Sequence, residues 1–278
     1  MPAGTDRGDA PRSGTTNGAT TFEAFLKLPD AVARIPEELP ERPAFETAAV
    51  SYLPLDGEVV PTLFVRDVLR DIAGELLAAV DAAIVLAEPV ANGARVVDAS
   101  PSLPLPSIVL DLTFTDTGET LQVPAHGLVW VATQSPKFEP ILSLLDLPPL
   151  DYDREGRHLV LPTHAVRVPS FSAWQPLHDF IHDRSTAHLL EYLLHASRER
   201  RSSSSGVTPL ANSSSTAAER ERHERETLEK LDRIRGLWLN AVALQIGDDD
   251  LWATMALAWD SLYDQARRNT PIRSSPES

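Results

Sequence analysis

The chain has 278 residues, of which 42% are apolar, and 40 acidic against 25 basic residues give it a formal net charge of −15. Such an acidic chain offers no broad surface for nucleic-acid phosphates, and the lack of cysteine excludes disulfides, thiol nucleophiles and cysteine-based zinc sites. The sequence contains neither a secretory signal at residues 1–21 nor a run of about 18 apolar residues that could span a membrane. We therefore expect an intracellular globular protein, nuclear or cytoplasmic, that binds neither nucleic acid nor membrane directly.

The N-terminal third combines a polar tail with a proline-rich segment. Residues 1–21 are too polar to bury apolar surface and are expected to be disordered. Residues 22–106 are interrupted by prolines, which favour short elements. Within this segment, apolar residues recur at three- and four-residue steps from Thr62 to Ala87. This spacing predicts one long amphipathic helix over residues 62–88.

Alternating apolar residues indicate strands in the centre of the chain. Residues 108–115 and 120–123 flank the turn sequence Asp116-Thr117-Gly118-Glu119 and are expected to form a β-hairpin. Helical spacing follows over residues 126–145. Ser135-Pro136 divides this stretch into two short helices, because serine can cap a helix and proline fits its first turn.

Two further strand-like runs, at residues 158–161 and 165–168, precede two predicted helices. Ser170 is expected to cap the first of these helices, and the second covers roughly residues 185–196. The first helix has an apolar stripe formed by Phe171, Trp174, Leu177, Phe180 and Ile181.

A serine-rich stretch separates the centre from the C-terminal part. Residues 198–218 are predicted to be a flexible linker. Residues 219–268 form two amphipathic patterns, and Gly247 is expected to end the first helix. So short a connection predicts an antiparallel helical hairpin, followed by a polar tail at 269–278.

The most catalytic-looking pattern is the run from His178 to His182, which places two imidazoles at i and i+4 on one helical face, as in zinc sites. A metalloprotease would have glutamate where Asp179 stands, and the sequence fixes no third ligand. Nearby candidates are His188, Glu191 and His195. We expect both imidazoles on the solvated face of the helix, without a metal. A metal-dependent hydrolase using His178 and His182 is an alternative.

Other polar patterns favour structural roles. The run Asp248-Asp249-Asp250 lacks the glycine and glutamate of a calcium loop, and Asp248 or Asp249 suits the cap of a helix. His126 is not accompanied by a nucleophilic serine motif, and the chain has no phosphate-binding glycine loop. We therefore predict no catalytic residue and no cofactor. Three tryptophans on the inner stripes of the C-terminal helices are expected in the core: Trp238, Trp252 and Trp259.

The central segment, residues 107–197, resembles the BTB/POZ module. The resemblance is carried by a strand before His126, by Ser135-Pro136-Lys137-Phe138, and by a later strand that leads into a helix with Phe171, Trp174 and Phe180. Gly127 replaces the lysine usual in that family, the usual aspartate before the first strand is missing, and the loop at 147–157 is long. The resemblance implies a small sheet flanked by helices, with a homodimer as one option.

The whole layout is similar to the clampless-type developmental regulators of basidiomycete fungi. The shared features are Pro124-Ala125-His126-Gly127, Pro169-Ser170-Phe171, Gly236-Leu237-Trp238-x-Asn240, Asp249-x-Leu251-Trp252 and Ala258-Trp259-Asp260. This similarity implies a non-enzymatic regulator of clamp formation, mating and dikaryon cell cycle, which acts through protein partners such as transcription regulators. A substrate adaptor of a cullin-type ubiquitin ligase is the alternative. The expected fold class is α+β: a BTB/POZ-like sheet with flanking helices and a C-terminal helical hairpin.

Overall fold

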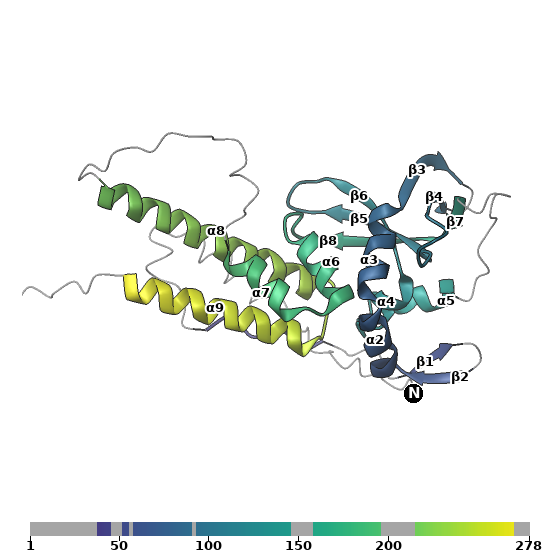
Figure 1. Ribbon diagram of the computed structural model, residues 1–278, viewed down its shortest axis with the longest axis horizontal. Coiled ribbons are helices and arrows are strands. Elements are labelled where there is room, and N and C mark those ends of the chain that lie inside the picture. Colours follow the sequence, from purple (N-terminus) through teal and green to yellow (C-terminus); the bar gives the residue numbers. More distant parts are fainter. Residues whose placement is uncertain are drawn as a thin grey trace, which may run out of the picture.

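The computed structural model describes residues 38–45, 52–55, 58–90, 93–145, 158–195 and 215–269. It has a mixed α/β architecture in which small sheets and short helices lie at one end and two long helices extend from them (Figure 1). Within these ranges, none of the helices is long and apolar enough to cross a membrane. The tail at 1–21, the loop at 147–157, most of the predicted linker and the tail after residue 269 lie outside the described residues.

The N-terminal part of the described chain is a β-hairpin followed by two short helices. β1 (Tyr52–Leu55) and β2 (Glu58–Pro61) pair antiparallel, with Leu53 opposite Val60. α2 (Thr62–Asp71) follows directly and α3 (Ala73–Ala82) comes next. Hairpin and helix are thus adjacent both in sequence and in space.

The single helix predicted over residues 62–88 is wrong, because this stretch forms two helices and a strand. The break lies at Ile72, where φ is −109° and ψ is 14°. After α3, the chain forms β3 (Ile84–Pro89), which pairs antiparallel with β4 (Arg95–Asp98). Apolar spacing cannot reveal this partner strand, which supplies the backbone hydrogen bonds that favour an extended conformation.

The middle of the chain forms two three-stranded sheets. β5 (Ile108–Phe114) lies between β6 (Thr120–Ala125), its antiparallel hairpin partner, and β8 (Thr163–Val168), which runs parallel to it. β7 (His158–Leu161) belongs to the other sheet, where it pairs with β4. Two strands that are neighbours in sequence therefore serve different sheets.

Short helices follow both edges of the central sheet. α4 (Gly127–Val131), the 3-10 turn η3 (Glu139–Ile141) and α5 (Leu142–Leu145) come after β6. α6 (Trp174–Asp183) and α7 (Thr186–Leu194) come after β8. α6 is the central helix of the molecule, because it contacts α2, α3, α4, α7 and α8.

The two long helices, α8 (Ser215–Ala243) and α9 (Asp249–Asn269), run side by side in opposite directions (Figure 1). The expectation that Gly247 ends α8 is wrong. Gln245 instead adopts the left-handed conformation with φ of 53°, while its N–H bonds the Val242 carbonyl at 3.0 Å and the Ile246 N–H bonds the Ala241 carbonyl at 2.9 Å. These two bonds satisfy carbonyls that the end of a helix leaves free.

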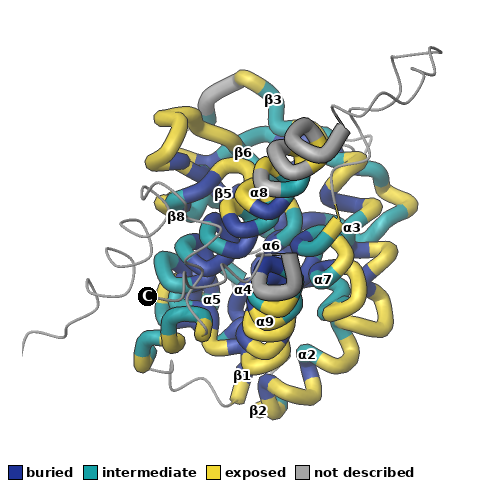
Figure 2. Tube along the Cα trace, turned by 90° about the vertical axis from the view of Figure 1, so that its left-hand side faces the viewer, coloured by how far each residue is buried: buried dark blue, intermediate teal, exposed yellow. Residues whose placement is uncertain are grey.

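Most buried apolar residues form one core that extends from the central sheet to α8 and α9. The colouring of Figure 2 shows this buried interior around α4, α5 and α6. Trp130 of α4 and Trp174 of α6 stack at its centre, with ring centroids 5.5 Å apart and planes 2° apart. The tryptophans of the long helices, Trp238, Trp252 and Trp259, are buried in the same core.

Candidate functional site

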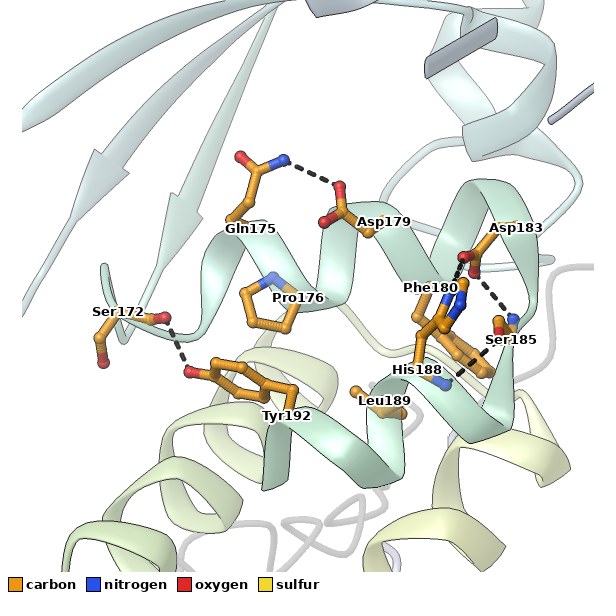
Figure 3. A pocket seen from close by; sticks show the side chains of 10 residues that line it. All are labelled: Ser172, Gln175, Pro176, Asp179, Phe180, Asp183, Ser185, His188, Leu189 and Tyr192. Atoms are coloured by element: carbon orange, nitrogen blue, oxygen red, sulfur yellow. Dashed lines mark hydrogen bonds and ion pairs between the residues drawn. The ribbon is translucent and has the colours of Figure 1, made fainter. Parts of the chain in front are cut away.

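An open groove of about 450 Å³ lies between α6 and α7 (Figure 3). We call it the α6–α7 groove. Its apolar part comes from Pro176, Phe180 and Leu189, and carboxylates and hydroxyls surround this part. The lining residues are Ser172, Gln175, Pro176, Asp179, Phe180, Asp183, Ser185, His188, Leu189 and Tyr192.

The polar groups of the α6–α7 groove are largely bonded to one another. The Gln175 amide donates to the Asp179 carboxylate at 2.8 Å, and the Tyr192 hydroxyl donates to the Ser172 carbonyl at 3.1 Å (Figure 3). These bonds hold the side chains of the groove walls in place. The polar groups at the rim therefore already have hydrogen-bond partners, while the floor of the groove is apolar.

Asp183, Ser185 and His188 lie together in the groove without forming a nucleophilic triad. His188 Nδ1 contacts the Asp183 carboxylate at 3.1 Å, as an orienting group would. Ser185 Oγ, however, accepts the backbone N–H of His188 at 3.2 Å and caps α7. A nucleophile must instead offer its oxygen to the imidazole. Its role as the cap of α7 therefore accounts for the serine.

Three buried histidines outside the lining of the groove lie close together, and we call them the histidine cluster: His126, His178 and His182. The ring centroids of His178 and His182 are 4.4 Å apart, and those of His126 and His182 are 6.4 Å apart. His182 Nδ1 donates to the His178 carbonyl at 2.8 Å, and His126 Nε2 bonds the Leu76 carbonyl of α3 at 3.2 Å. The cluster therefore connects α3, the start of α4 and α6.

Burial lowers the pKa of two of these imidazoles, those of His126 and His182. Removal from water, together with the neighbouring His178 ring, lowers the pKa of His182 to about 3. Burial also lowers the pKa of His126, although its bond to the Leu76 carbonyl acts in the opposite direction. A neutral, enclosed imidazole cannot exchange protons with a substrate in solution.

The prediction that His178 and His182 face solvent is wrong, because each is only 2% exposed. The apolar stripe of α6 suggested a helix covered on one face. In the fold, α3 and α4 cover the side that carries the histidines, while α7 and α8 also pack on this helix. A sequence pattern on one helix cannot show that a second layer lies over its other side.

The described residues contain no group of three or more His, Asp or Glu side chains placed to hold a metal ion. In the same part of the chain, the Nε2 atoms of His178 and His182 and the Nε1 atom of Trp130 are buried without a hydrogen-bond partner. Of the predicted extra ligands, His188 bonds Asp183, and His195 bonds the Glu191 carbonyl at 3.2 Å. The neighbouring imidazoles of His178 and His182 thus lack a third ligand from the described chain.

A second buried arrangement joins α8 to the end of β8. Asn240 is fully buried, its carbonyl oxygen accepts the Ser170 N–H at 2.8 Å, and its amide donates to the Ser170 carbonyl at 2.9 Å. At Gly236, one turn earlier, a Cβ atom would lie 2.8 Å from Ser170 Oγ and 3.0 Å from the Ala173 Cβ. We call Ser170, Ala173, Gly236 and Asn240 the docking seam.

The docking seam corrects the prediction for Ser170 and explains part of the C-terminal motif. The Ser170 backbone is bonded across the seam, and α6 begins only at Trp174. In the motif Gly236-Leu237-Trp238-x-Asn240, the glycine lets α8 approach Ser170 and Ala173 closely. The asparagine side chain bonds the backbone N–H and carbonyl of Ser170, which follows the last strand.

A buried ion pair connects α6 to α9. Arg184, at the C-terminal end of α6, donates to the Asp248 carboxylate, and both side chains are less than a tenth exposed. Asp248 also accepts the Leu251 N–H at 3.1 Å and thereby caps α9, as predicted for this position or the next. Asp249 contacts Arg42 at 2.7 Å on the surface. The sequence pattern gave no signal for Arg184.

The other predicted hallmark residues are mostly structural. Ser135 Oγ donates to the Leu244 carbonyl, and Phe138 is buried against Trp130 with centroids 4.8 Å apart. Trp252 Nε1 donates to the Ile246 carbonyl at 2.8 Å. Phe171 is half-exposed and contacts Phe114 edge-on at 4.9 Å.

Residues 187–272 match the family model described as Clampless protein 1 C-terminal domain. No curated protein matches the chain, and no solved structure matches it either. The match confirms the predicted resemblance to the clampless-type family for the part of the chain that forms α7, α8 and α9. The resemblance of residues 107–197 to the BTB/POZ module stays a prediction.

Proposed function

We propose that this protein is a non-enzymatic regulator of fungal sexual development that acts through protein–protein contacts. The observation that carries the proposal is the match of residues 187–272 to the Clampless protein 1 C-terminal domain. Three of its helices, α7, α8 and α9, pack on one another, and α8 is joined to the rest of the protein by the docking seam. The docking seam therefore fixes the position of α8, within residues 187–272, relative to the preceding part of the protein.

The chemistry of the described residues supports a role without catalysis. The carboxylates and the imidazole of the α6–α7 groove are paired internally, and the histidine cluster is enclosed, with the pKa of His182 lowered to about 3. A groove with an apolar floor and a satisfied polar rim suits the side chains of a protein partner better than a reacting small molecule.

For residues 107–197 we propose a BTB/POZ-like module. Support comes from the chain order in the sheet β6–β5–β8: a hairpin, the step at His126, short helices, a third strand and then α6. The alternative function, an adaptor of a cullin-type ubiquitin ligase, rests on this module. The hydrolase alternative rests on His178 and His182 alone.

The proposal can be tested by complementation. The full-length chain would be expressed in a clamp-forming basidiomycete strain whose own clampless gene is deleted, and clamp connections would be counted after mating. The wild-type chain and the control Leu257→Ser, at an exposed position of α9, should restore clamps. Gly236→Leu should not, because its side chain cannot fit the docking seam. A normally expressed wild-type chain that restores no clamps contradicts the proposal.

Affinity purification from mating cells separates the three functions. Transcription regulators among the co-purifying proteins, without a cullin and without stoichiometric zinc, agree with a developmental regulator acting in the nucleus. A cullin recovered in stoichiometric amount favours the adaptor. Bound zinc that disappears with His178→Ala favours the hydrolase.

A further inference from the structure

An exposed apolar surface lies on the side of the molecule formed by β1, β2 and α2. Phe64 is 61% exposed and Val59 is 70% exposed, and their neighbours are similarly open to solvent. Figure 2 shows α2 and the β1–β2 hairpin as a largely exposed region at one end of the fold. We call this surface the α2 face: Tyr52, Val59, Leu63, Phe64, Val68 and Ile72.

The apolar character of the α2 face is not a by-product of core packing. In the hairpin, Leu53 is buried and faces Val60 across the strands, so Tyr52 and Val59 occupy the opposite face. In α2, the core side is occupied by Thr62 and Val65. A helix and a hairpin that already have buried faces would ordinarily carry polar residues on the other side.

Five exposed side chains, four in α2 and one directly after it, form two parallel rows. Phe64, Val68 and Ile72 are spaced by four residues and form an apolar ridge. Asp67 and Asp71 follow the first two at a distance of three residues and form an acidic row beside that ridge, with both side chains exposed.

Basic side chains of the same helix neutralise the negative charge of Asp67 and Asp71 only weakly. Arg70 lies 3.8 Å from Asp67 in an exposed pair, which contributes little and leaves the carboxylate accessible. Arg66 is directed away, to the Asp248 carboxylate at 3.5 Å. The α2 face therefore presents an apolar ridge with a negative border.

We propose that the α2 face binds an amphipathic helix of a partner protein, whose apolar stripe is bordered on one side by lysines or arginines. An i, i+4 apolar ridge fits into the groove of a second helix, and the acidic row selects a basic border on that helix. The inference specifies the class of partner for the proposed function, and it rests on that function only for its biological role.

The test uses the full-length chain and two synthetic helical peptides. Both peptides carry leucines at i, i+3 and i+4, and they differ only in whether the bordering positions are lysine or glutamate. Fluorescence anisotropy at low ionic strength should show at least tenfold tighter binding of the lysine peptide. This preference should shrink as salt screens the exposed charges.

Variants at exposed positions assign the binding site without disturbing the core. Phe64→Ser/Val68→Ser should weaken binding of the lysine peptide at least tenfold, and Asp67→Lys/Asp71→Lys should reverse the preference towards the glutamate peptide. The matched controls Leu257→Ser and Asp260→Lys make the same kinds of change on the exposed side of α9 and should leave affinity unchanged.

Four results would overturn the inference. These are equal binding of the two peptides, an equal loss in the α9 controls, dimerisation of the chain that Phe64→Ser/Val68→Ser abolishes, and cross-linking of the α2 face to residues 22–28 of the same chain. The third result would assign the surface to a second copy, and the fourth to the chain's own N-terminal segment. Since the peptide assay does not involve mating, it can fail while clamp restoration succeeds, and the reverse.

Discussion

The docking seam and the α2 face are both surfaces on which helices can meet, yet they are built in opposite ways. At the seam, Asn240 satisfies both backbone groups of Ser170, and Gly236 lets the backbones approach closely. On the α2 face, Phe64 and Val68 are exposed, and two carboxylates lie beside them. The polar groups of the docking seam are paired within the protein, whereas the apolar side chains of the α2 face are exposed to solvent.

Because the two surfaces differ in this way, residues that stabilise the fold can be distinguished from residues available for binding. Burial with complete pairing makes each seam residue expensive to replace, because its partner is left without a hydrogen bond in the interior. Exposed side chains contribute little to the folded state, so their apolar character calls for another explanation. Four substitutions, given in order of decreasing expected loss of stability, test this contrast between buried and exposed residues.

The largest effect is expected from Arg184→Met. It leaves the Asp248 carboxylate buried without its main partner, and the free energy of unfolding should fall by about 3 kcal/mol. Arg42→Met removes a contact to the adjacent Asp249 at the surface and should cost about 0.5 kcal/mol or less. Urea unfolding of both variants measures the two values, and equal losses would contradict the assignment of a buried pair.

Asn240→Leu should lower the free energy of unfolding by about 2 kcal/mol, because it leaves the Ser170 N–H and carbonyl unpaired in the interior. Ser261→Ala is the control, since it removes a hydroxyl bond to the Leu257 carbonyl at an exposed site of α9. Denaturant curves that superimpose for the two variants would show that the seam does not hold α8 in place.

Acidification should destabilise the protein through the histidine cluster. The pKa of His182 is about 3 in the folded protein and about 6.5 in the unfolded chain, so the unfolded chain binds more protons between these values. Its contribution to stability is complete above pH 6.5 and is lost as the pH falls towards 3. Between pH 7.5 and 5.5 the loss should be about 1.4 kcal/mol.

The matched variants for this pH dependence are His182→Phe and His188→Phe. The first removes the buried imidazole and should flatten the decline in the free energy of unfolding over that pH range. The second removes an exposed imidazole and should leave the decline unchanged. A steep decline that survives in His182→Phe would place the titrating group elsewhere.

The smallest effect is expected from Phe64→Ser. Its side chain is mostly exposed, so the free energy of unfolding should change by about 0.5 kcal/mol or less. Leu231→Ser, at a fully buried position of α8, makes the same kind of change and should be several times more destabilising than Phe64→Ser. Thermal unfolding of the two variants suffices, and a large loss at Phe64 would mean that the α2 face is covered within the chain.

Local signals in the sequence found much of the fold. The turn at Gly118 and the alternation around it located the hairpin of β5 and β6, and the apolar spacing over residues 185–196 located α7. These features depend on a few consecutive residues. A single stretch therefore contains the information that fixes them.

Features that depend on distant partners were missed. The strand β3 exists because β4 pairs with it, and His178 and His182 are buried because α3 and α4 cover that side of α6. For the candidate site, the sequence singled out both histidines and Asn240. It could not show that the first two are enclosed or that the third bonds to Ser170.

The pair of Arg184 and Asp248 has a consequence for cooperativity. The C-terminal end of α6 carries a partial negative charge, which the Arg184 cation complements. The N-terminal end of α9 carries a partial positive charge, which the Asp248 carboxylate complements. If either of these helix ends unfolded, the charged side chain at the other end would lose its ion-pair partner. The two helices, one in the centre of the chain and one near its end, are thereby joined into a single unfolding unit, whose amide protons should exchange together.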